Sequence, residues 1–368
     1  MSDTLSLDDF NIGFNLKFGY ATVTISHQNG TIFGTQRVES NEVYKSAFRK
    51  LASRDYCHYA LVRSLGYSTR PNTRSRPPYF TPQARWSDYC RQLIRRGRKA
   101  VGLPASYDVA AIATVIRDLK IAAEKMLGFE ITAAAASVPR IPAIYDENLY
   151  NSFEYVGLES LQITEATYHE TFLTYESMAA LAGHGLAVCP NITDPNTCPI
   201  ETLQDNYIVI DYTKESLFAY STHARSAYYV IKSAAFDLDL GSDAQHNYPY
   251  EEHYWYAVRQ ILLRPFLENI NNPIKNIILG GEESSINNTG FREILNDVIE
   301  EFFLDKPVPE IIARDPEWVQ AKGVAELVRR RPYLPIPVRP EMKVGSQRDF
   351  RNEIEKKQDI ILGDQLEL

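Results

Sequence analysis

The spacing of hydrophobic and polar positions predicts that the chain opens with a β-meander. Residues 12–25 alternate well enough for two strands around a turn at residues 17–19. Asn29-Gly30 is a strong two-residue hairpin signal, and residues 31–35 form the expected returning strand. The chain is therefore expected to begin with antiparallel strands.

Apolar residues at helical spacing predict several longer elements. Ser106 as a capping residue and Gly128 as a stop bound a helix over Tyr107–Leu127. The clearest amphipathic pattern covers residues 291–303. Further helices are expected over residues 149–158, 177–187 and 251–267, and from the pair Asp315-Pro316. Strands are expected over residues 131–139, 161–163, 227–233 and 275–279, whereas residues 40–105 are mixed in pattern.

A second strand–turn–strand unit lies in the middle of the chain. Residues 206–211 have the apolar, β-branched character of a short buried strand, and this strand ends in the carboxylate of Asp211. Residues 212–216 then form a turn, and residues 217–221 resume as a strand. Because residues 12–25 form a similar unit, two related halves are expected.

Length and composition indicate an ordinary globular protein of two lobes or domains. The chain has 368 residues, of which 44% are hydrophobic and 23% charged. The net charge of −8 argues against nucleic-acid binding, which needs a basic face. No apolar run reaches the length of a membrane helix, which is about 20 residues. The acidic N-terminus does not resemble a leader, which points to the cytoplasm.

Cysteines and histidines give no metal-binding pattern. The four cysteines form no CxxC pair, and the seven histidines show no spacing such as HExxH. Cys189 and Cys198 bracket a polar loop, but a disulfide is not expected in a reducing compartment. Zinc is therefore not expected.

A run of basic residues lies ahead of the helix that begins at Tyr107. It consists of Arg91, Arg95, Arg96, Arg98 and Lys99. A solvated helix face is the favoured interpretation of such a run, and an anion-binding patch is the alternative.

Seven segments, in order, resemble the nucleotide-binding domain of the seventy-kilodalton heat-shock chaperone ATPases, which shares its fold with actin and hexokinase. Residues 12–21 (IGFNLKFGYA) resemble the family's first phosphate hairpin, IGIDLGTTYS, and residues 132–139 stand where the family has a strand ending in VPA. Residues 176–186 (ESMAALAGHGL) resemble EPTAAALAYGL, and residues 211–219 stand at the second hairpin, DLGGGTFDV. Residues 232–241 resemble KSTAGDTHLG, residues 278–281 the adenosine-motif glycines, and residues 315–325 DPDEAVAYGAA.

The resemblance implies an α/β protein with the actin-like ATPase (ribonuclease H-like) fold, in which each of two lobes has a mixed sheet and flanking helices. Lobe I is expected over residues 1–190, lobe II over 191–331, and a tail over 332–368. The cofactor implied is ATP with Mg²⁺. The resemblance places Glu176 and Asp211 as catalytic acids, with Asp211 also near the metal. It places Asn15, Lys17, Lys214, Gly280, Gly281 and Asp315 around the nucleotide.

The departures from the family pattern fall on the residues that would bind phosphate. Phosphate hairpins use glycine because the backbone must approach the anion and point its N–H groups inward. Lys17 and Phe18 replace Gly-Thr in the first hairpin, residues 212–215 replace the glycine run of the second, and Asn15 replaces an aspartate that helps to hold Mg²⁺. The segment between Asp211 and Gly280 is about half the family's length, so the small subdomain that clamps adenine is missing.

Charge in the second hairpin adds to these departures. If Glu215 faced the phosphates at about 4 Å, repulsion would cost on the order of 4 kcal/mol at an effective dielectric constant near 20. Micromolar ATP affinity amounts to about 8 kcal/mol in total. Lys17 or Lys214 would have to compensate for that loss.

Three functions follow as hypotheses. The first is a degenerate pseudo-ATPase with weak or no hydrolysis that acts as a binding or scaffold module for an unknown protein partner. The second is a divergent ATP-binding protein or ATPase that uses Asp211, Glu176 and Asp315. The third is a cleft reused for another small molecule or as an enzyme site, lined by the aromatic residues within 248–256, although ordinary packing of an aromatic-rich helix is the favoured interpretation of these. Neither a nucleic-acid nor a membrane partner is expected.

Overall fold

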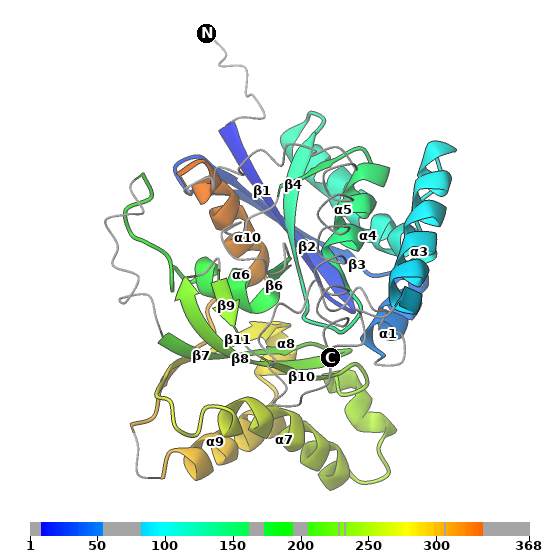
Figure 1. The fold of residues 1–368 in the computed structure, drawn as a ribbon. Coiled ribbons are helices and arrows are strands. Elements are labelled where there is room, and N and C mark those ends of the chain that lie inside the picture. Colours follow the sequence, from blue (N-terminus) through cyan, green and yellow to red (C-terminus); the bar gives the residue numbers. More distant parts are fainter. Residues whose placement is uncertain are drawn as a thin grey trace, which may run out of the picture.

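Two mixed β-sheets, one above the other in Figure 1, form two lobes. The structure, a computed structural model, describes residues 9–53, 82–161, 173–193, 205–226, 229–231, 233–304 and 307–333. The first sheet contains β1 (Phe10–Leu16), β2 (Tyr20–His27), β3 (Ile32–Glu39), β4 (Ala133–Val138), β5 (Glu159–Ser160) and β6 (Thr174–Tyr175). The second contains β7 (Asp205–Tyr212), β8 (Leu217–Ser226), β9 (Tyr229–Ile231), β10 (Ala234–Asp237), β11 (Ile274–Gly281) and β12 (Glu310–Ile312).

The two sheets repeat one strand order. It is β3-β2-β1-β4-β5 in the first sheet and β10-β8-β7-β11-β12 in the second. In both, the edge strand, its neighbour and the central strand (β3-β2-β1 or β10-β8-β7) are antiparallel, and the last two strands run parallel to the central strand. β6 and β9 pair with β4 and β8, outside this order. The repeat confirms the prediction of an actin-like ATPase fold with a mixed sheet in each lobe.

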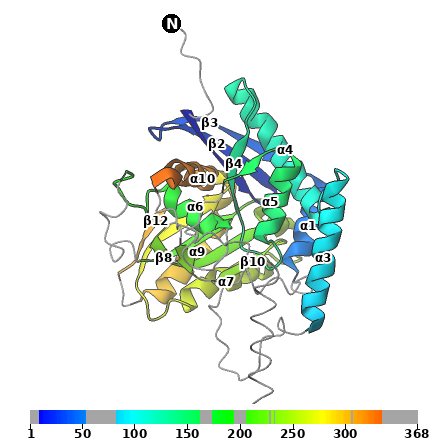
Figure 2. The same cartoon turned by 45° about the horizontal axis from the view of Figure 1, so that its top comes forward.

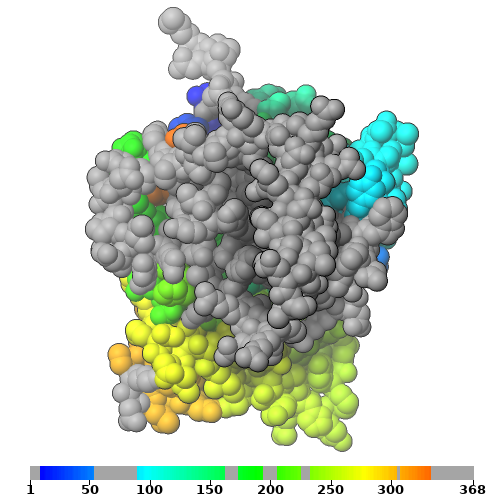
Figure 3. Space-filling model, in the orientation of Figure 1, coloured from blue at the N-terminus to red at the C-terminus, as the bar shows by residue number. Residues whose placement is uncertain are grey.

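Helices cover both sheets and the junction between them. They are α1 (Glu42–Ala52), α3 (Pro82–Ala100), α4 (Tyr107–Leu127), α5 (Asp146–Tyr155), α6 (Glu176–Gly183), α7 (Glu251–Leu267), α8 (Glu283–Ile286), α9 (Thr289–Phe302) and α10 (Val319–Arg330). In Figure 1, α7 and α9 lie below the second sheet, and α6 lies between the sheets. Figure 2 shows α1 and α3 at the outer edge of the first lobe, and Figure 3 shows α3 in cyan at the rim of the drawn face.

Strand β7 joins the two lobes because its side chains alternate between two hydrophobic cores. Tyr207 and Val209 belong to the core that extends into the first lobe. Ile208 and Ile210 belong to the core beneath α7 and α9. Successive side chains of a strand point to opposite faces, so Asp211 lies on the face that meets the first lobe. The junction is therefore packed by apolar residues.

The last helix packs on the first lobe, although the expected boundary at residue 191 places it in the second. A Cβ on Gly13 of β1 would lie 2.3 Å from the Ala325 backbone nitrogen of α10. A Cβ on Gly323 would lie 1.7 Å from the Ala179 carbonyl oxygen of α6. Glycine at these crossings lets the backbones approach closely. The helix also begins at Val319 and not at Asp315-Pro316. Asp315 has a left-handed φ of 48°, so its backbone is not helical, although its carbonyl oxygen accepts from both Trp318 N–H and Val319 N–H.

Other element boundaries differ by a few residues. The helices over Tyr107–Leu127 and Glu251–Leu267 have the predicted bounds, and Gly128 ends the first of them with a φ of 80°. α5 begins three residues before the predicted start at 149, and α6 ends at Gly183, before the predicted 187. The predicted tail over 332–368 lies outside the described residues from 334 onward. None of the described helices is both long and apolar enough to span a bilayer.

One cysteine differs from the expectation. Cys189 is disulfide-bonded, which corrects the prediction of reduced thiols. Cys57 and Cys198 lie outside the described residues, and Cys90 is free.

Candidate functional site

The two predicted phosphate hairpins meet in a buried ion pair. Lys17, in the turn after β1, contacts Asp211 Oδ2 through its Nζ, and both side chains are only 2% exposed. Gln320 of α10 donates from Nε2 to the same oxygen at 2.7 Å. Asp211 Oδ2 therefore has two donors from the protein itself.

Glu176 is the carboxylate next to this pair. It is the first residue of α6 and is 1% exposed. Tyr220 of β8 donates its hydroxyl to Glu176 Oε2 at 2.8 Å. Burial and the Asp211 charge raise the pKa of Glu176 to about 8, although Lys17 and hydrogen bonds from Tyr220 and Asn15 act in the opposite direction. Near neutral pH the group is therefore protonated, and the buried cluster of Lys17, Asp211 and Glu176 carries no net charge.

Asn15 completes the cluster in place of the expected metal-binding aspartate. The parallel register of β1 and β4 sets Asn15 beside Ser137, whose hydroxyl donates to Asn15 Oδ1 at 2.8 Å. Asn15 Nδ2 and Glu176 Oε1 are both buried, and neither has a hydrogen bond of ordinary geometry in the described part of the chain. Asn15 nevertheless lowers the pKa of Glu176, so the Asn15 amide lies close to the Glu176 carboxyl group.

The backbone amides in the turn of the second hairpin donate hydrogen bonds to acceptors of the protein itself. Thr213 N–H donates to the Ser216 carbonyl at 3.0 Å. Ser216 N–H and Glu215 N–H both donate to Thr213 Oγ1, at 3.0 and 3.3 Å. Lys214 N–H donates to Glu282 Oε2 at 2.5 Å. The four amides from 213 to 216 thus have acceptors within the protein, whereas a phosphate hairpin presents such groups to the anion.

Glu215 closes the space between the two turns. A Cβ on Gly19 of the first turn would lie 3.0 Å from Glu215 Oε1. Lys45 Nζ lies 2.6 Å from the same oxygen. The carboxylate therefore lies against the first turn and is neutralised by a lysine of the first lobe.

Among the described residues, the ion pairs that join the lobes have one polarity. In each pair the first lobe supplies the cation and the second lobe the carboxylate. The pairs are Lys17–Asp211, Arg37–Glu282 and Arg37–Glu317, both at 2.8 Å, Lys45–Glu215 at 2.6 Å and Arg49–Asp239 at 2.5 Å. Opposite charge thus attracts the two lobes to each other across the junction.

The adenosine-type glycines also contact protein. A Cβ on Gly280 would lie 2.3 Å from Gln320 Nε2 and 2.9 Å from Asp211 Oδ2. Gly281 has a φ of 112°, and a Cβ there would lie 2.0 Å from the Tyr212 carbonyl oxygen. Both glycines are needed for close packing of β11 against β7 and α10.

Two of the predicted site residues lie outside the buried cluster. The Lys214 side chain is half exposed, with Nζ 4.0 Å from Glu282 Oε1. The Asp315 side chain is 55% exposed and forms an ion pair with Lys322 at 2.7 Å. The structure thus brings together Asn15, Lys17, Glu176, Asp211 and Gly280, with Gly281 at the edge.

The aromatic residues within 248–256 do not line a cleft between the lobes. Tyr254 is buried in the core beneath the second sheet, where its hydroxyl is 2.6 Å from that of Tyr212. Tyr250 and Tyr256 are 66% and 65% exposed. The aromatic residues of this segment therefore either pack α7 against the second sheet, as Tyr254 does, or lie at the surface, as Tyr250 and Tyr256 do.

Sequence reasoning missed Gln320, Tyr220 and Glu282. Gln320 had a detectable signal, because it is a polar residue on the apolar face formed by Val319, Gly323 and Val324. Tyr220 and Glu282 had none, since their partners are remote in sequence.

Mg²⁺ and a triphosphate do not fit the residues at the two hairpins. Mg²⁺ is bound by charged oxygens, but Asp211 Oδ2 already contacts the Lys17 ammonium group, which would repel a metal ion there. The turn amides have protein acceptors, and the Glu215 carboxylate lies beside the first turn. Across the described part of the chain, no group of three or more His, Cys, Asp or Glu side chains could hold a metal ion.

Comparisons with known proteins give structural similarity without sequence relatives. No protein-family model and no curated protein matches the chain. Among solved structures, it is similar to the ethanolamine utilization protein EutJ from Carboxydothermus hydrogenoformans, with 16% identity, a TM-score of 0.44, and coverage of 86% of this chain and 90% of that one. It is also similar to the ROK hexokinase from Thermus thermophilus, with 11% identity, a TM-score of 0.40, and coverage of 86% and 97%. Similarity of this extent carries no argument about activity, and the fold assignment follows from the repeated strand order.

Proposed function

We propose that this protein is a pseudo-ATPase with an actin-like fold, which acts as a binding or scaffold module for a protein partner and neither binds nor hydrolyses ATP appreciably. The observation that carries the proposal is the buried Lys17–Asp211 pair. It supports this function because an ammonium group contacts the carboxylate that would face the metal.

The energetics at the hairpins support the same conclusion. For a triphosphate to enter, the turn amides at 213–216 would have to leave their present acceptors and Glu215 would have to move from the first turn. Leaving a buried polar group unpaired costs about 1–3 kcal/mol. Separating the buried Lys17–Asp211 pair to admit a metal ion costs about 3–5 kcal/mol. Together these costs approach the roughly 8 kcal/mol of a micromolar affinity.

The arrangement also supports a scaffold role. The same ion pairs and shared core that exclude a ligand hold the lobes in one relative position. A protein that presents a fixed surface to a partner loses little conformational entropy on binding. Conformational cycling driven by a nucleotide would require these contacts to open and close.

Two measurements on the whole protein test the proposal. The melting temperature should be unchanged by millimolar Mg-ATP, whereas a ligand at a hundred times its dissociation constant would stabilise the fold by about 2.7 kcal/mol and raise the melting temperature by a few degrees. Hydrogen exchange should find the amides at 213–216 protected in the absence of nucleotide.

The opposite results would overturn the proposal in defined ways. A thermal shift with Mg-ATP that Asp211→Asn abolishes would establish the divergent ATP-binding protein. Rapid hydrogen exchange of the backbone amides at 213–216 that becomes slower with Mg-ATP would also establish an ATP-binding protein. A shift produced by a metabolite other than a nucleotide, and lost in Asp211→Asn, would favour a reused cleft.

A further inference from the structure

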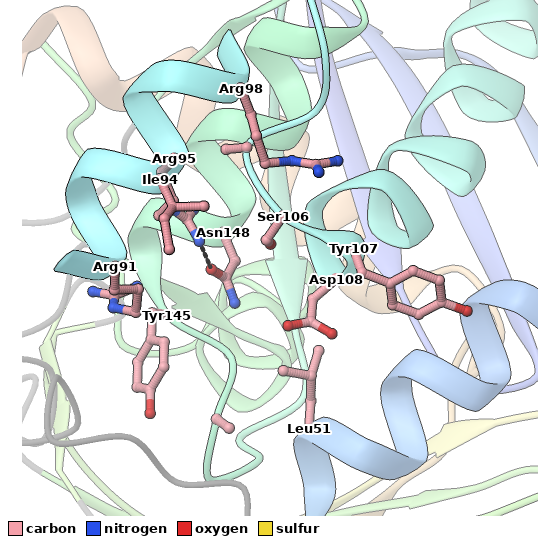
Figure 4. Close-up of a pocket in the computed structure, with 12 residues that line it drawn as sticks. Leu51, Arg91, Ile94, Arg95, Arg98, Ser106, Tyr107, Asp108, Tyr145 and Asn148 are labelled. Carbon is pink, nitrogen blue, oxygen red and sulfur yellow. Dashed lines mark hydrogen bonds between the residues drawn. The ribbon is translucent and has the colours of Figure 1, made fainter. Parts of the chain in front are cut away.

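A cavity in the first lobe, away from the two hairpins, is lined on one side by arginines. It has a volume of about 300 Å³ and lies among α1, α3, α4 and the segment leading into α5. Arg91, Arg95 and Arg98 of α3 line it, opposite Ser106 and Asp108 at the start of α4. Figure 4 shows these side chains around a common space, with Leu51 and Tyr145 on other sides. The volume is at the lower end of the range for small-molecule sites, which is about 300–1,000 Å³.

Arg95 is the side chain that points most directly to a ligand. It is only 6% exposed, and its Nε has no hydrogen-bond partner in the described part of the chain. Its other nitrogens make long hydrogen bonds of 3.3 Å, to Asn148 Oδ1 and the Glu147 carbonyl. Burial lowers the pKa of Arg95, and the nearby Arg91 charge adds to this, although Glu147 and Asp108 act in the opposite direction. A buried guanidinium group with an unused N–H is poorly satisfied without an anion.

The charges around the cavity favour an anion. Arg91, Arg95 and Arg98 line it, and Lys50 lies 4.0 Å from Asp108 at its edge. Against these four cations stand the carboxylates of Asp108 and Glu147, the latter paired with Arg91. Among the described residues at the cavity, cations outnumber carboxylates, which favours an anion such as a phosphate monoester.

The polarity of the walls indicates which end of a ligand lies where. The 21-residue helix α4 begins beside Arg98, so its positive dipole end adds to the arginines. Asp108 accepts hydrogen bonds and would repel phosphate oxygens, which suits a hydroxyl group. Leu51, Ile94 and Ala143 offer apolar contact for a carbon skeleton.

We infer that the cavity between α3 and the start of α4 is a binding site for a small phosphate monoester with hydroxyl groups, held by Arg95 and Arg98. The guanidinium fork matches phosphate geometry. The site is separate from the two hairpins and does not depend on whether they bind nucleotide. Such a ligand would tie α3 to α4 and α5, and so would stabilise the outer edge of the first lobe.

The experiment uses a panel of sugar phosphates of three to six carbons, including ribose 5-phosphate, with ribose and inorganic phosphate as separate arms. Binding to the full chain is measured by calorimetry at constant ionic strength. At least one ester should bind, ribose should not, and inorganic phosphate alone should bind more weakly. Arg95→Gln and Arg98→Gln should each weaken binding about tenfold or more, because each removes a charged hydrogen bond.

Arg96→Gln is the matched control, since Arg96 lies on the same helix, is exposed and does not line the cavity. It should leave the affinity unchanged. Equal weakening by Arg96→Gln and Arg95→Gln would reduce the effect to general attraction and overturn the site. Failure of every ester to bind, or equal affinity for inorganic phosphate and the esters, would overturn it as well. Melting curves without ligand identify a variant that fails to fold, and Arg98→Gln then carries the test.

Discussion

Lys17 and Asp211 are 194 positions apart in the sequence, yet the Lys17 ammonium group contacts Asp211 Oδ2 with both side chains almost fully buried. Because neither charge reaches water, each depends on the other. Lys17→Met should therefore destabilise the protein by about 3–5 kcal/mol, measured by urea unfolding at pH 7.

The double variant Lys17→Met/Asp211→Asn tests whether this cost comes from the unpaired carboxylate. Asparagine still offers Gln320 an acceptor and carries no charge. The double variant should lose clearly less stability than the sum of the two single variants. Additive losses would contradict direct coupling between Lys17 and Asp211.

Glu176 predicts an unusual pH dependence. Its pKa in the folded state is about 8, whereas the ordinary value is 4.5. Between these values the folded protein holds a proton that the unfolded chain has lost, so stability falls as pH rises from about 4.5 to 8. Glu176→Gln should flatten this slope, which is on the order of 1 kcal/mol per pH unit at most.

Unfolding free energies measured between pH 5 and 9 check this effect. Glu42→Gln is the control, because Glu42 is 91% exposed, and it should leave the slope unchanged. A slope that persists in Glu176→Gln would mean that another group carries it.

Arg37 should not be replaceable by lysine. Its Nη1 lies 2.8 Å from both Glu282 and Glu317, and its guanidinium carbon lies 3.9 Å from the centre of the Tyr20 ring. Burial lowers the pKa of Arg37, yet hydrogen bonds to Glu39, Glu317 and Glu282 outweigh burial and raise that pKa above its ordinary value. Arg37→Lys should cost about 1–2 kcal/mol, because lysine supplies neither the planar fork nor the stacking.

The exposed ion pair Arg49–Asp239 provides the contrast. Its side chains are 49% and 74% exposed, so water screens their attraction. Arg49→Lys should change the free energy of unfolding by less than about 0.5 kcal/mol. If both lysine variants lost the same stability, the geometry at Arg37 would not matter.

Two glycines should respond in opposite directions to alanine. Gly323→Ala would bring a Cβ to 1.7 Å from the Ala179 carbonyl oxygen, so α6 and α10 would have to separate, at a cost of about 3 kcal/mol or more. Gly97 lies within α3, where an added methyl group would have nothing within 4 Å, and Gly97→Ala should stabilise by about 0.5–1 kcal/mol. Thermal unfolding of the two variants checks both signs.

Local patterns predicted the elements that local chemistry determines. Ser106 and Gly128 gave the bounds of α4, because a cap and a left-handed stop act within one turn. α1 was missed in the mixed segment over 40–105, whereas the basic run at residues 91–99, interpreted as a helix face, does lie on α3. The cap of α1 is Asn41, whose side chain accepts from Tyr44 N–H, a signal that the surrounding pattern obscured.

The candidate site was only partly predictable, because its contacts join segments that are far apart in the sequence. The changed hairpin residues directed attention to the two turns, and Lys17 and Asp211 do lie together. That Lys17 neutralises Asp211, and that Glu282 accepts from the Lys214 amide, depend on contacts between segments far apart in the sequence. Asp315 was placed near the nucleotide by resemblance alone, whereas its side chain pairs with Lys322 at the surface.

The packing of α10 on the first sheet has a consequence for the order in which the lobes are completed during synthesis. The core beneath the second sheet draws its buried residues from one continuous stretch, from Ile208 to Phe303. The other core needs Val324 and Leu327 of α10 beside strands that begin at Phe10. The core of the first lobe can therefore be completed only after residues more than three hundred positions beyond Phe10 have been synthesised. A chain that ended before Val319 would lack α10 and would leave β1 uncovered.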